Sequence, residues 1–274
     1  MVFLKLLKTS PWSVRIGIAI ILINIFAAVF APYLAPYSET EICGRVWMSP
    51  SSDHWLGTDH LGRDLYTRLL YGARNTIAIA FVATMLSFLA GTIFGLLAAT
   101  LGGWADLIMS RVIDILLAFP TLIFALMVLS VVGTSVTSLI VVIAILNSTR
   151  VYRLSRAVAM DIEVMEFVEA ARLRGERIWW IMRREILPNA MPPLVAEFGL
   201  RFCFVFLFIA SLSFLGLGIK PPSADWGSMV RQNAGAIAFG IFIPLWPAGA
   251  IAFLTVGVNL IVDWFLHLAS GLKD

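Results

Sequence analysis

Hydrophobic residues in this chain gather in six stretches that polar segments separate. Each stretch is continuous and close to the ~20 residues that a helix needs to cross the hydrocarbon core of a membrane. Because lipid offers no partners to backbone N–H and C=O groups, we expect each stretch to be helical. The stretches are Val14 to Ala31, Thr76 to Thr100, Val112 to Val132, Val136 to Val158, Met191 to Leu217 and Ile241 to Leu266. The pattern predicts an all-α, polytopic membrane protein with six transmembrane helices.

The composition agrees with this prediction. Hydrophobic residues make up 60% of the chain, charged residues 14%, and the mean hydropathy is +0.91. The net charge of +3 comes from basic residues beside the apolar stretches, which indicates membrane orientation rather than nucleic-acid binding. We expect residues 1–75 to form an N-terminal span with an extracytoplasmic loop, and residues 76–274 to form a five-helix core.

The distribution of basic residues predicts the orientation. Basic residues concentrate in the segments that lie on the same side of the membrane as the N-terminus. In membrane proteins the cytoplasmic segments are enriched in Lys and Arg. Both termini and the segment 161–188 are therefore expected in the cytoplasm. The residues on that side are Lys5, Lys8, Arg15, Arg150, Arg153, Arg156, Arg172, Arg174, Arg177, Arg183, Arg184 and Lys273.

The charged segment 161–188 lies between two apolar stretches and has the pattern of a helical hairpin. Its first half repeats a charged residue every three positions, so Glu169 is expected to pair with Arg172. Gly175 suits a left-handed turn, and Pro188 is expected to end a second short helix. The small side chains of Ala170 and Ala171 would let a partner protein approach closely, although the same basic segment could lie on anionic lipid.

The opposite side holds two longer loops. Leu61, Leu65 and Leu69 are spaced four apart, which predicts an amphipathic surface helix with Thr58 or Asp59 as its N-cap. That helix could be a lid over the spans or a docking site. Trp226 follows Pro221-Pro222 and is expected at the depth of the membrane interface.

Ionisable residues inside the apolar stretches are the default candidates for function. Glu197 and Arg201 are four residues apart and can neutralise one another, either as a structural pair near a gate or in contact with the substrate. Gly91 and Gly95 form a GxxxG pattern that favours internal helix packing. Cys43 and Cys203 do not suggest a disulfide framework, and the three histidines do not suggest a metal site.

Three motifs together resemble a known family. The series Glu169-Ala170-Ala171, Gly175 and Leu187-Pro188 resembles the EAA loop of permease subunits of ABC importers, which have the type I importer fold. Two further stretches are similar to the dipeptide, oligopeptide and nickel group, specifically its second, shorter permease: His54 to Asp59 with Leu61 to Asp64, and Ser213 to Gly218 with Pro221-Pro222 and Trp226-Gly227. Glu185 departs from the pattern, where the family has an apolar residue or a histidine.

The resemblance implies partners and a mechanism. Glu169, Ala170, Ala171, Gly175, Leu187 and Pro188 would dock into a groove of a cytoplasmic ATPase subunit. Two such ATPase subunits would hold ATP and Mg, and this chain would hold no cofactor or metal and have no catalytic residues. A second homologous permease and an extracytoplasmic binding protein would complete the importer in the bacterial inner membrane, embedded in lipid. Peptides are the expected substrates, with nickel complexes, glutathione or short oligosaccharides as alternatives.

Two other functions remain open on the sequence alone. A secondary carrier or channel would work without an ATPase, and inverted repeats with broken helices would favour it. A membrane-embedded enzyme would need a cluster of His, Asp or Glu at one membrane face. The chain contains no Gly-Lys pair and therefore no phosphate-binding loop, so any ATP must bind to another protein.

Overall fold

The computed structural model describes residues 11–270 and the side chains of residues 11–266. Lys5, Lys8 and Lys273, which contribute to the predicted orientation, lie outside the described residues. The described part of the chain is helical and contains two isolated β-bridges but no strand. The all-α prediction is therefore confirmed.

Among the described residues, five helices are long and apolar enough to span a membrane. They are α2 (Trp12–Val29), α4 (Leu65–Leu101), α7 (Val136–Glu163), α10 (Leu187–Phe214) and α12 (Leu245–Ser270). The boundary at residue 75 falls inside α4, and the two-part division of the chain stays a prediction.

The third predicted span is broken into two helices. α5 (Gly103–Ala118) and α6 (Thr121–Val132) meet at an angle of 88°, and the described chain has six spans only if this pair counts as one. The break lies at Phe119 and Pro120, which both have extended ψ angles. Proline has no N–H to donate and disfavours helical geometry in the residue before it, which explains why one continuous span does not form here.

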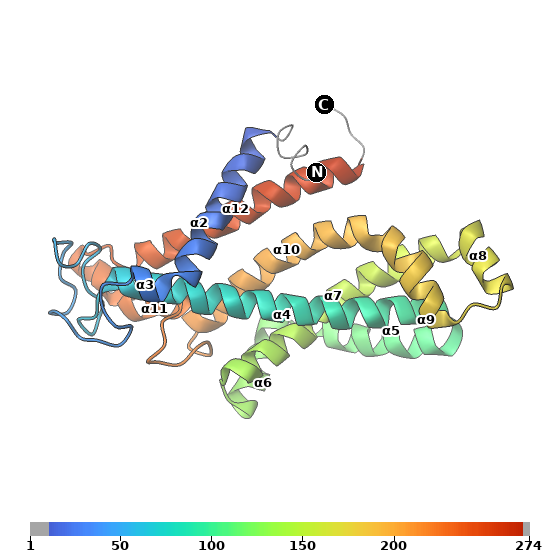
Figure 1. Cartoon of the computed structure of the whole chain (residues 1–274). Coiled ribbons are helices and arrows are strands. Elements are labelled where there is room, and N and C mark those ends of the chain that lie inside the picture. The colour runs from blue at the N-terminus through green and yellow to red at the C-terminus, as the bar shows by residue number, and fades with distance from the viewer. Residues whose placement is uncertain (1–10, 271–274) are drawn as a thin grey trace.

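The long helices form an elongated bundle. α4 and α7 pack along one another, and Figure 1 shows α4 running along most of the molecule with α7 beside it toward the end that carries α8. A Cβ atom added at Gly91 would lie 2.6 Å from Cβ of Val151, and one at Gly95 would lie 2.8 Å from Cβ of Ser155. The GxxxG pattern thus serves packing between helices of the same chain, as predicted.

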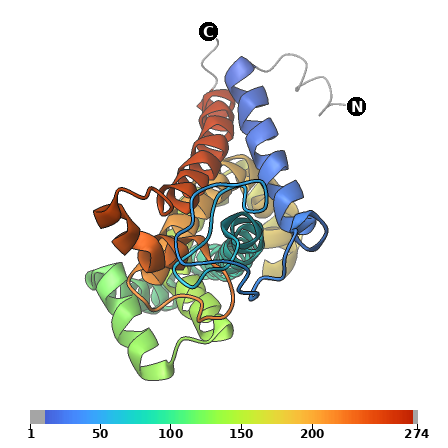
Figure 2. The same cartoon turned by 90° about the vertical axis from the view of Figure 1, so that its left-hand side faces the viewer.

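α2 and α12 lie together on one side of the bundle and α6 projects from the opposite side, as Figures 1 and 2 show. The larger hydrophobic core fills the space between α4, α7, α10 and α12, and includes Leu65, Leu129, Ile143, Phe206 and Trp226.

The two ends of the bundle differ. The loop end consists of residues 35–64 and 218–244, and includes α11 (Trp226–Asn233) and the 3₁₀ helix η2 (Ala234–Phe239); the four-residue helix α3 (Ala31–Leu34) leads into it. The hairpin end consists of residues 161–188, with α8 (Glu166–Leu173), α9 (Ile178–Ile181) and the π-helical turn η1 (Met182–Ile186). In Figure 1 the loop end is on the left and the hairpin end on the right.

The expectation that Pro188 ends a helix is wrong. Leu187 has helical dihedral angles (φ −58°, ψ −45°), and the helical chain continues from Ile178 to Phe214. The π-helical turn shifts the hydrogen-bond register just before Pro188, which lies in the first turn of α10, where its missing N–H is tolerated.

Candidate functional site

The helix α8 presents two different faces at the hairpin end. Val168 and Ala171 are fully buried, whereas Glu169 and Ala170 are exposed. The buried face belongs to a second hydrophobic core that joins α8 to the adjacent ends of α4, α7 and α10. That core consists of Leu96, Ala99, Ala159, Ile162, Val168, Ala171, Ile181, Met182, Ile186, Ala190 and Leu194. α8 is therefore anchored to three of the long helices while its other face stays open.

Gly175 ends α8 in the left-handed conformation that the sequence predicts. Its φ is +81°, which residues with a Cβ atom adopt only with strain. The N–H of Gly175 donates to the carbonyl of Arg172 (2.9 Å), and the N–H of Glu176 donates to the carbonyl of Ala171 (3.2 Å). These two bonds form a Schellman motif, which satisfies the last carbonyls of α8 and reverses the chain.

Ion pairs hold the hairpin in an arrangement that differs from the expected one. Arg172 pairs with Glu163 at the end of α7 rather than with Glu169, so the predicted pair within α8 is wrong. Glu163 can reach Arg172 because α7 ends there and the chain turns between α7 and α8. As a result, the carboxylate of Glu169 has no ion-pair partner among the described side chains.

Glu185, which departs from the family pattern, also has a partner. Its carboxylate lies 3.7 Å from the guanidinium of Arg174, and that guanidinium lies 5.7 Å from the ring centre of Trp180. Glu185 thus connects η1 to the turn after α8. Leu187 is half-buried against the second core, and Pro188 is exposed beside it.

Glu197 and Arg201 form the predicted pair inside α10. Nε of Arg201 donates to Oε1 of Glu197 at 3.0 Å, and the guanidinium is buried. Nη1 of Arg201 has no hydrogen-bond partner among the described residues. The pair lies within the span, more than two turns from Leu187, so it is separate from the hairpin end.

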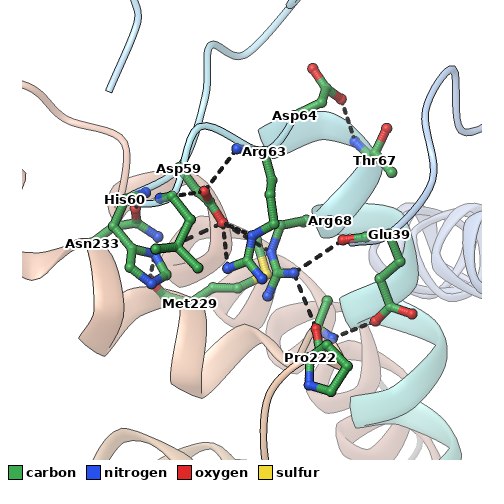
Figure 3. A network of polar contacts seen from close by, with 12 residues as sticks. Glu39, Asp59, His60, Arg63, Asp64, Thr67, Arg68, Pro222, Met229 and Asn233 are labelled. Atoms are coloured by element: carbon green, nitrogen blue, oxygen red, sulfur yellow. Dashed lines mark hydrogen bonds and ion pairs between the residues drawn. The ribbon is translucent and has the colours of Figure 1, made fainter. Parts of the chain in front are cut away.

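The loop end contains a buried ionic cluster that the sequence analysis missed (Figure 3). Asp59 accepts hydrogen bonds from the Arg63 side chain (2.8 Å), and Nε of Arg68 lies 3.2 Å from the same carboxylate. Arg68 also donates to the carbonyls of Glu39 (3.2 Å) and Pro222 (3.3 Å). The sequence shows Asp and Arg residues around Leu61, but their spacing also fits an amphipathic helix. It does not show that the partners of these residues come from both loops.

The predicted surface helix at residues 58–70 is therefore wrong. α4 begins at Leu65, which is fully buried, and its N-cap is Asp64, whose Oδ2 accepts from the N–H of Thr67 at 2.8 Å. Asp59 is instead held by two arginines. Leu65 and Leu69 belong to the first turns of a spanning helix, whereas Leu61 lies in the loop before it and is exposed.

Asn233 ties α11 to the first loop. Its Oδ1 accepts from the N–H of His60 (2.9 Å) and from Nε1 of Trp47 (3.3 Å). Trp226 is also buried, and its Nε1 donates to the carbonyl of Leu69 at 2.9 Å. Its depth relative to the membrane interface stays a prediction. The two loops are thus joined to each other and to α4.

The described residues contain no group of three or more His, Cys, Asp or Glu side chains that could hold a metal ion.

Comparison with known proteins places the chain among transport proteins. Residues 91–270 match the family described as binding-protein-dependent transport system inner membrane component. The chain is 36% identical to the dipeptide transport system permease protein DppC of Alkalihalophilus pseudofirmus, over 98% of this chain and 86% of that protein. It is 34% identical to the glutathione transport system permease protein GsiD of Pectobacterium atrosepticum, over 96% of this chain and 85% of that protein.

Solved structures show the same fold. The MetNI methionine ABC transporter in an inward-facing conformation aligns with a TM-score of 0.60 and 20% identity, over 73% of this chain and 95% of the matched chain. An amino acid ABC transporter aligns with a TM-score of 0.53, over 72% of this chain and 92% of that chain. The protein therefore belongs to the family of binding-protein-dependent transport system inner membrane components, as a permease of an ABC importer.

Proposed function

We propose that this chain couples ATP hydrolysis by partner subunits to the import of peptides or related small solutes. The observation that carries the proposal is the pair of faces on α8: one is buried in a core shared with the long helices, and the other is open. A partner that moves the open face of α8 would move the ends of α4, α7 and α10 with it, since close-packed cores transmit displacement.

The open face has the features of a docking surface. Ala170 leaves the backbone of α8 accessible, Glu169 offers an unpaired carboxylate, and Leu173 and Trp179 are exposed apolar side chains. Apolar contacts supply binding energy and the charge sets the register. We assign ATPase coupling to Glu169, Ala170, Ala171, Gly175, Leu187 and Pro188, with Ala171 and Leu187 supporting the open face from within.

Membership of the family supports a set of proposed partners. Two ATPase subunits would bind ATP and Mg, an extracytoplasmic binding protein would deliver the substrate, and a second homologous permease would complete the path. This chain would have no catalytic residues and no nucleic-acid partner. The hairpin end and both termini would lie in the cytoplasm, on the side richer in basic residues. Glu197 and Arg201 would act near the gate, as a pair that stabilises α10 inside the membrane.

Peptides are the substrate class that the relatives favour. Relatives over most of the chain include a dipeptide permease protein, a glutathione permease protein and a di/tripeptide permease protein from Pseudomonas aeruginosa. The substrates that give these three proteins their names are all short peptides.

Adjacent alanines in α8 offer a matched test of the docking face. Ala170→Cys and Ala171→Cys, each in a background without Cys43 and Cys203, would be purified in detergent, so that both ends of the protein are accessible, and treated with a hydrophilic maleimide. Cys at 170 should be labelled in the permease alone and protected once the ATPase subunits assemble, because Ala170 is exposed. Cys at 171 should resist labelling in both states, because Ala171 is fully buried.

An exposed position at the loop end is the control for a loss of labelling that does not depend on docking at α8. Lys220→Cys should be labelled equally with and without the ATPase subunits. Equal labelling at position 170 in the two states would contradict the assignment of α8 as the docking face.

A further inference from the structure

The loop end contains a small hollow that the proposed coupling function does not use. It has a volume of about 250 Å³ and lies between residues 36–55 and the first turn of α4. Its lining is acidic and aromatic, and consists of Pro36, Tyr37, Ser52, Asp53, Trp55, Asp64 and Tyr66. The volume is too small for a folded segment and suits the end of one side chain.

The hollow carries uncompensated negative charge. Asp53 is exposed, and its carboxylate accepts a hydrogen bond from the Ser52 hydroxyl (3.5 Å) but has no ion-pair partner among the described residues. Asp64 is buried, and its two oxygens already face Nδ1 of His54 (3.0 Å) and the N–H of Thr67 (2.8 Å). Asp64 therefore offsets the positive end of α4, while Asp53 leaves a free carboxylate at the mouth.

Two buried arginines of the loop end do not neutralise this charge. Arg63 and Arg68 are both held by Asp59, which does not line the hollow. Burial and the neighbouring acidic groups, including Asp53, raise the pKa of the Tyr37 hydroxyl, as expected where the potential is negative.

Aromatic rings form the rest of the wall. The ring of Trp55 is 63% exposed and its centre lies 5.0 Å from the ring centre of Tyr66. The Tyr37 hydroxyl donates to the carbonyl of Asp53 (3.1 Å), which fixes the segment that carries the carboxylate. Aromatic faces attract cations, and tryptophan does so most strongly.

We propose that this hollow receives a lysine or arginine side chain of the extracytoplasmic binding protein when that protein docks. The inference rests on the proposed function, because it needs the loop end to face the side from which the binding protein arrives. Charge complementarity supports it: the free carboxylate of Asp53 would pair with the cation while Trp55 and Tyr66 contact the aliphatic stem and the charge. The buried Asp59 cluster holds the hollow in shape before docking, which limits the entropy lost on binding.

The test measures docking apart from transport. The complete importer in nanodiscs would be titrated with its substrate-loaded binding protein, and the dissociation constant measured at low and high salt. Asp53→Asn and Trp55→Ala should each weaken docking by about five- to tenfold at low salt, because each removes one part of the cation site. Asp53→Asn should also flatten the salt dependence.

Glu41→Gln is the matched control. Glu41 is an exposed carboxylate on the same loop that does not line the hollow, and it raises the pKa of Tyr37 less than Asp53 does. The same loss of charge there should therefore leave docking within twofold of the wild type. Trp55→Phe keeps an aromatic face and should restore most of the affinity lost in Trp55→Ala. If the incoming residue is lysine, a carbodiimide should cross-link its amine directly to the carboxylate of Asp53. The binding protein should then be cross-linked to the wild-type importer and much less to Asp53→Asn.

Docking of the binding protein and ATP-dependent uptake, measured on the same importer, separate this proposal from the proposed function. If the wild-type importer hydrolyses ATP and takes up peptide, and Asp53→Asn and Trp55→Ala dock as tightly as Glu41→Gln, the hollow is not a docking site and the proposed function stands. If substrate binding to the importer changes but docking of the binding protein does not, a free peptide amine occupies the hollow and the proposal is overturned. An importer that assembles but shows no ATP-dependent uptake would instead count against the proposed function.

Discussion

The guanidinium of Arg68 lies 3.2 Å from the carboxylate of Asp59, and both side chains are 1% exposed. Arg68 belongs to the first turn of α4, whereas Asp59 belongs to the loop that precedes it. With Arg63, this pair fixes a long loop over the end of a spanning helix, and Arg68 extends the same cluster to Pro222 in the second loop.

Asp59→Asn should destabilise the loop end strongly. The change preserves the size of the side chain but removes the ion-pair partner that two buried guanidinium groups share, a loss of about 3–5 kcal/mol for broken buried pairs. Thermal unfolding of the purified protein in detergent should show a clearly lower Tm, and proteolysis of residues 35–64 should become faster. Lys220→Gln, an exposed charge at the same end, should leave both unchanged. An unaltered Tm in Asp59→Asn would contradict the role of the cluster.

The loop end should lose stability on acidification in two steps. Burial lowers the pKa of His60 in the folded protein. The unfolded chain therefore binds a proton at this residue near pH 6.5, whereas the folded protein does not. The free energy of unfolding falls as the pH drops through that value. For Asp59, burial raises the pKa, but hydrogen bonds from Arg63 and from backbone N–H groups outweigh it, so the pKa lies below the ordinary value. The stability from Asp59 is therefore present above the ordinary carboxyl range and is lost only at lower pH.

Comparing Tm between pH 8 and pH 5 in the wild type and in His60→Gln would check the first step. The decrease in Tm should be smaller in the variant, because glutamine does not titrate. Equal decreases in the two proteins would show that His60 does not contribute.

Gly91→Ala should separate α4 from α7. The added Cβ would lie 2.6 Å from Cβ of Val151 and 2.7 Å from the carbonyl oxygen of Ser148. Such overpacking costs about 1–3 kcal/mol, so the Tm should fall. Gly249→Ala in α12 is the matched control, because no atom lies within 4 Å of the added Cβ; its Tm should stay the same or rise slightly.

Gly175→Val should reduce transport without removing the protein from the membrane. A left-handed φ costs a residue with a Cβ about 1–2 kcal/mol, and more for a β-branched one, so the Schellman turn after α8 would open. Gly175→Asn should retain most of the uptake, because asparagine tolerates this conformation. Uptake of a labelled peptide by membrane vesicles, normalised to the amount of permease, measures both. Full uptake by Gly175→Val would mean that the turn is not needed for coupling.

The charges of Glu197 and Arg201 should be needed together. Arg201→Met leaves a carboxylate inside the span, where an isolated charge costs about 2.5–3.5 kcal/mol on insertion scales, and should lower the amount of folded protein. The double variant Glu197→Gln with Arg201→Met removes both charges and should recover much of the loss. If the double variant is folded but transports poorly, the pair has a role near the gate beyond stability.

Local patterns in the sequence predicted local features well. The apolar stretches marked the spans, Gly175 marked the turn, and the spacing of Gly91 and Gly95 marked a close helix contact. Each of these depends on residues within a few turns of one another. The break after Ala118 was also visible in principle, because Pro120 lies inside the third apolar stretch.

Pairings between distant segments were not predictable in this way. Arg172 had Glu169 within reach on the same helix, and only the turn between α7 and α8 makes Glu163 the partner. Asp59 resembled a helix cap because its two arginine partners and the second loop meet only after folding. The burial of Trp226 was not visible in the sequence, because its partner carbonyl belongs to Leu69, far away in sequence.

Uptake by reconstituted liposomes tests the central claim most directly. The complete importer, with its ATPase subunits, second permease and binding protein, should accumulate a labelled peptide when ATP is supplied. This chain alone in the same liposomes should carry no peptide, with or without ATP and with or without a gradient. Transport by the isolated chain would contradict the account.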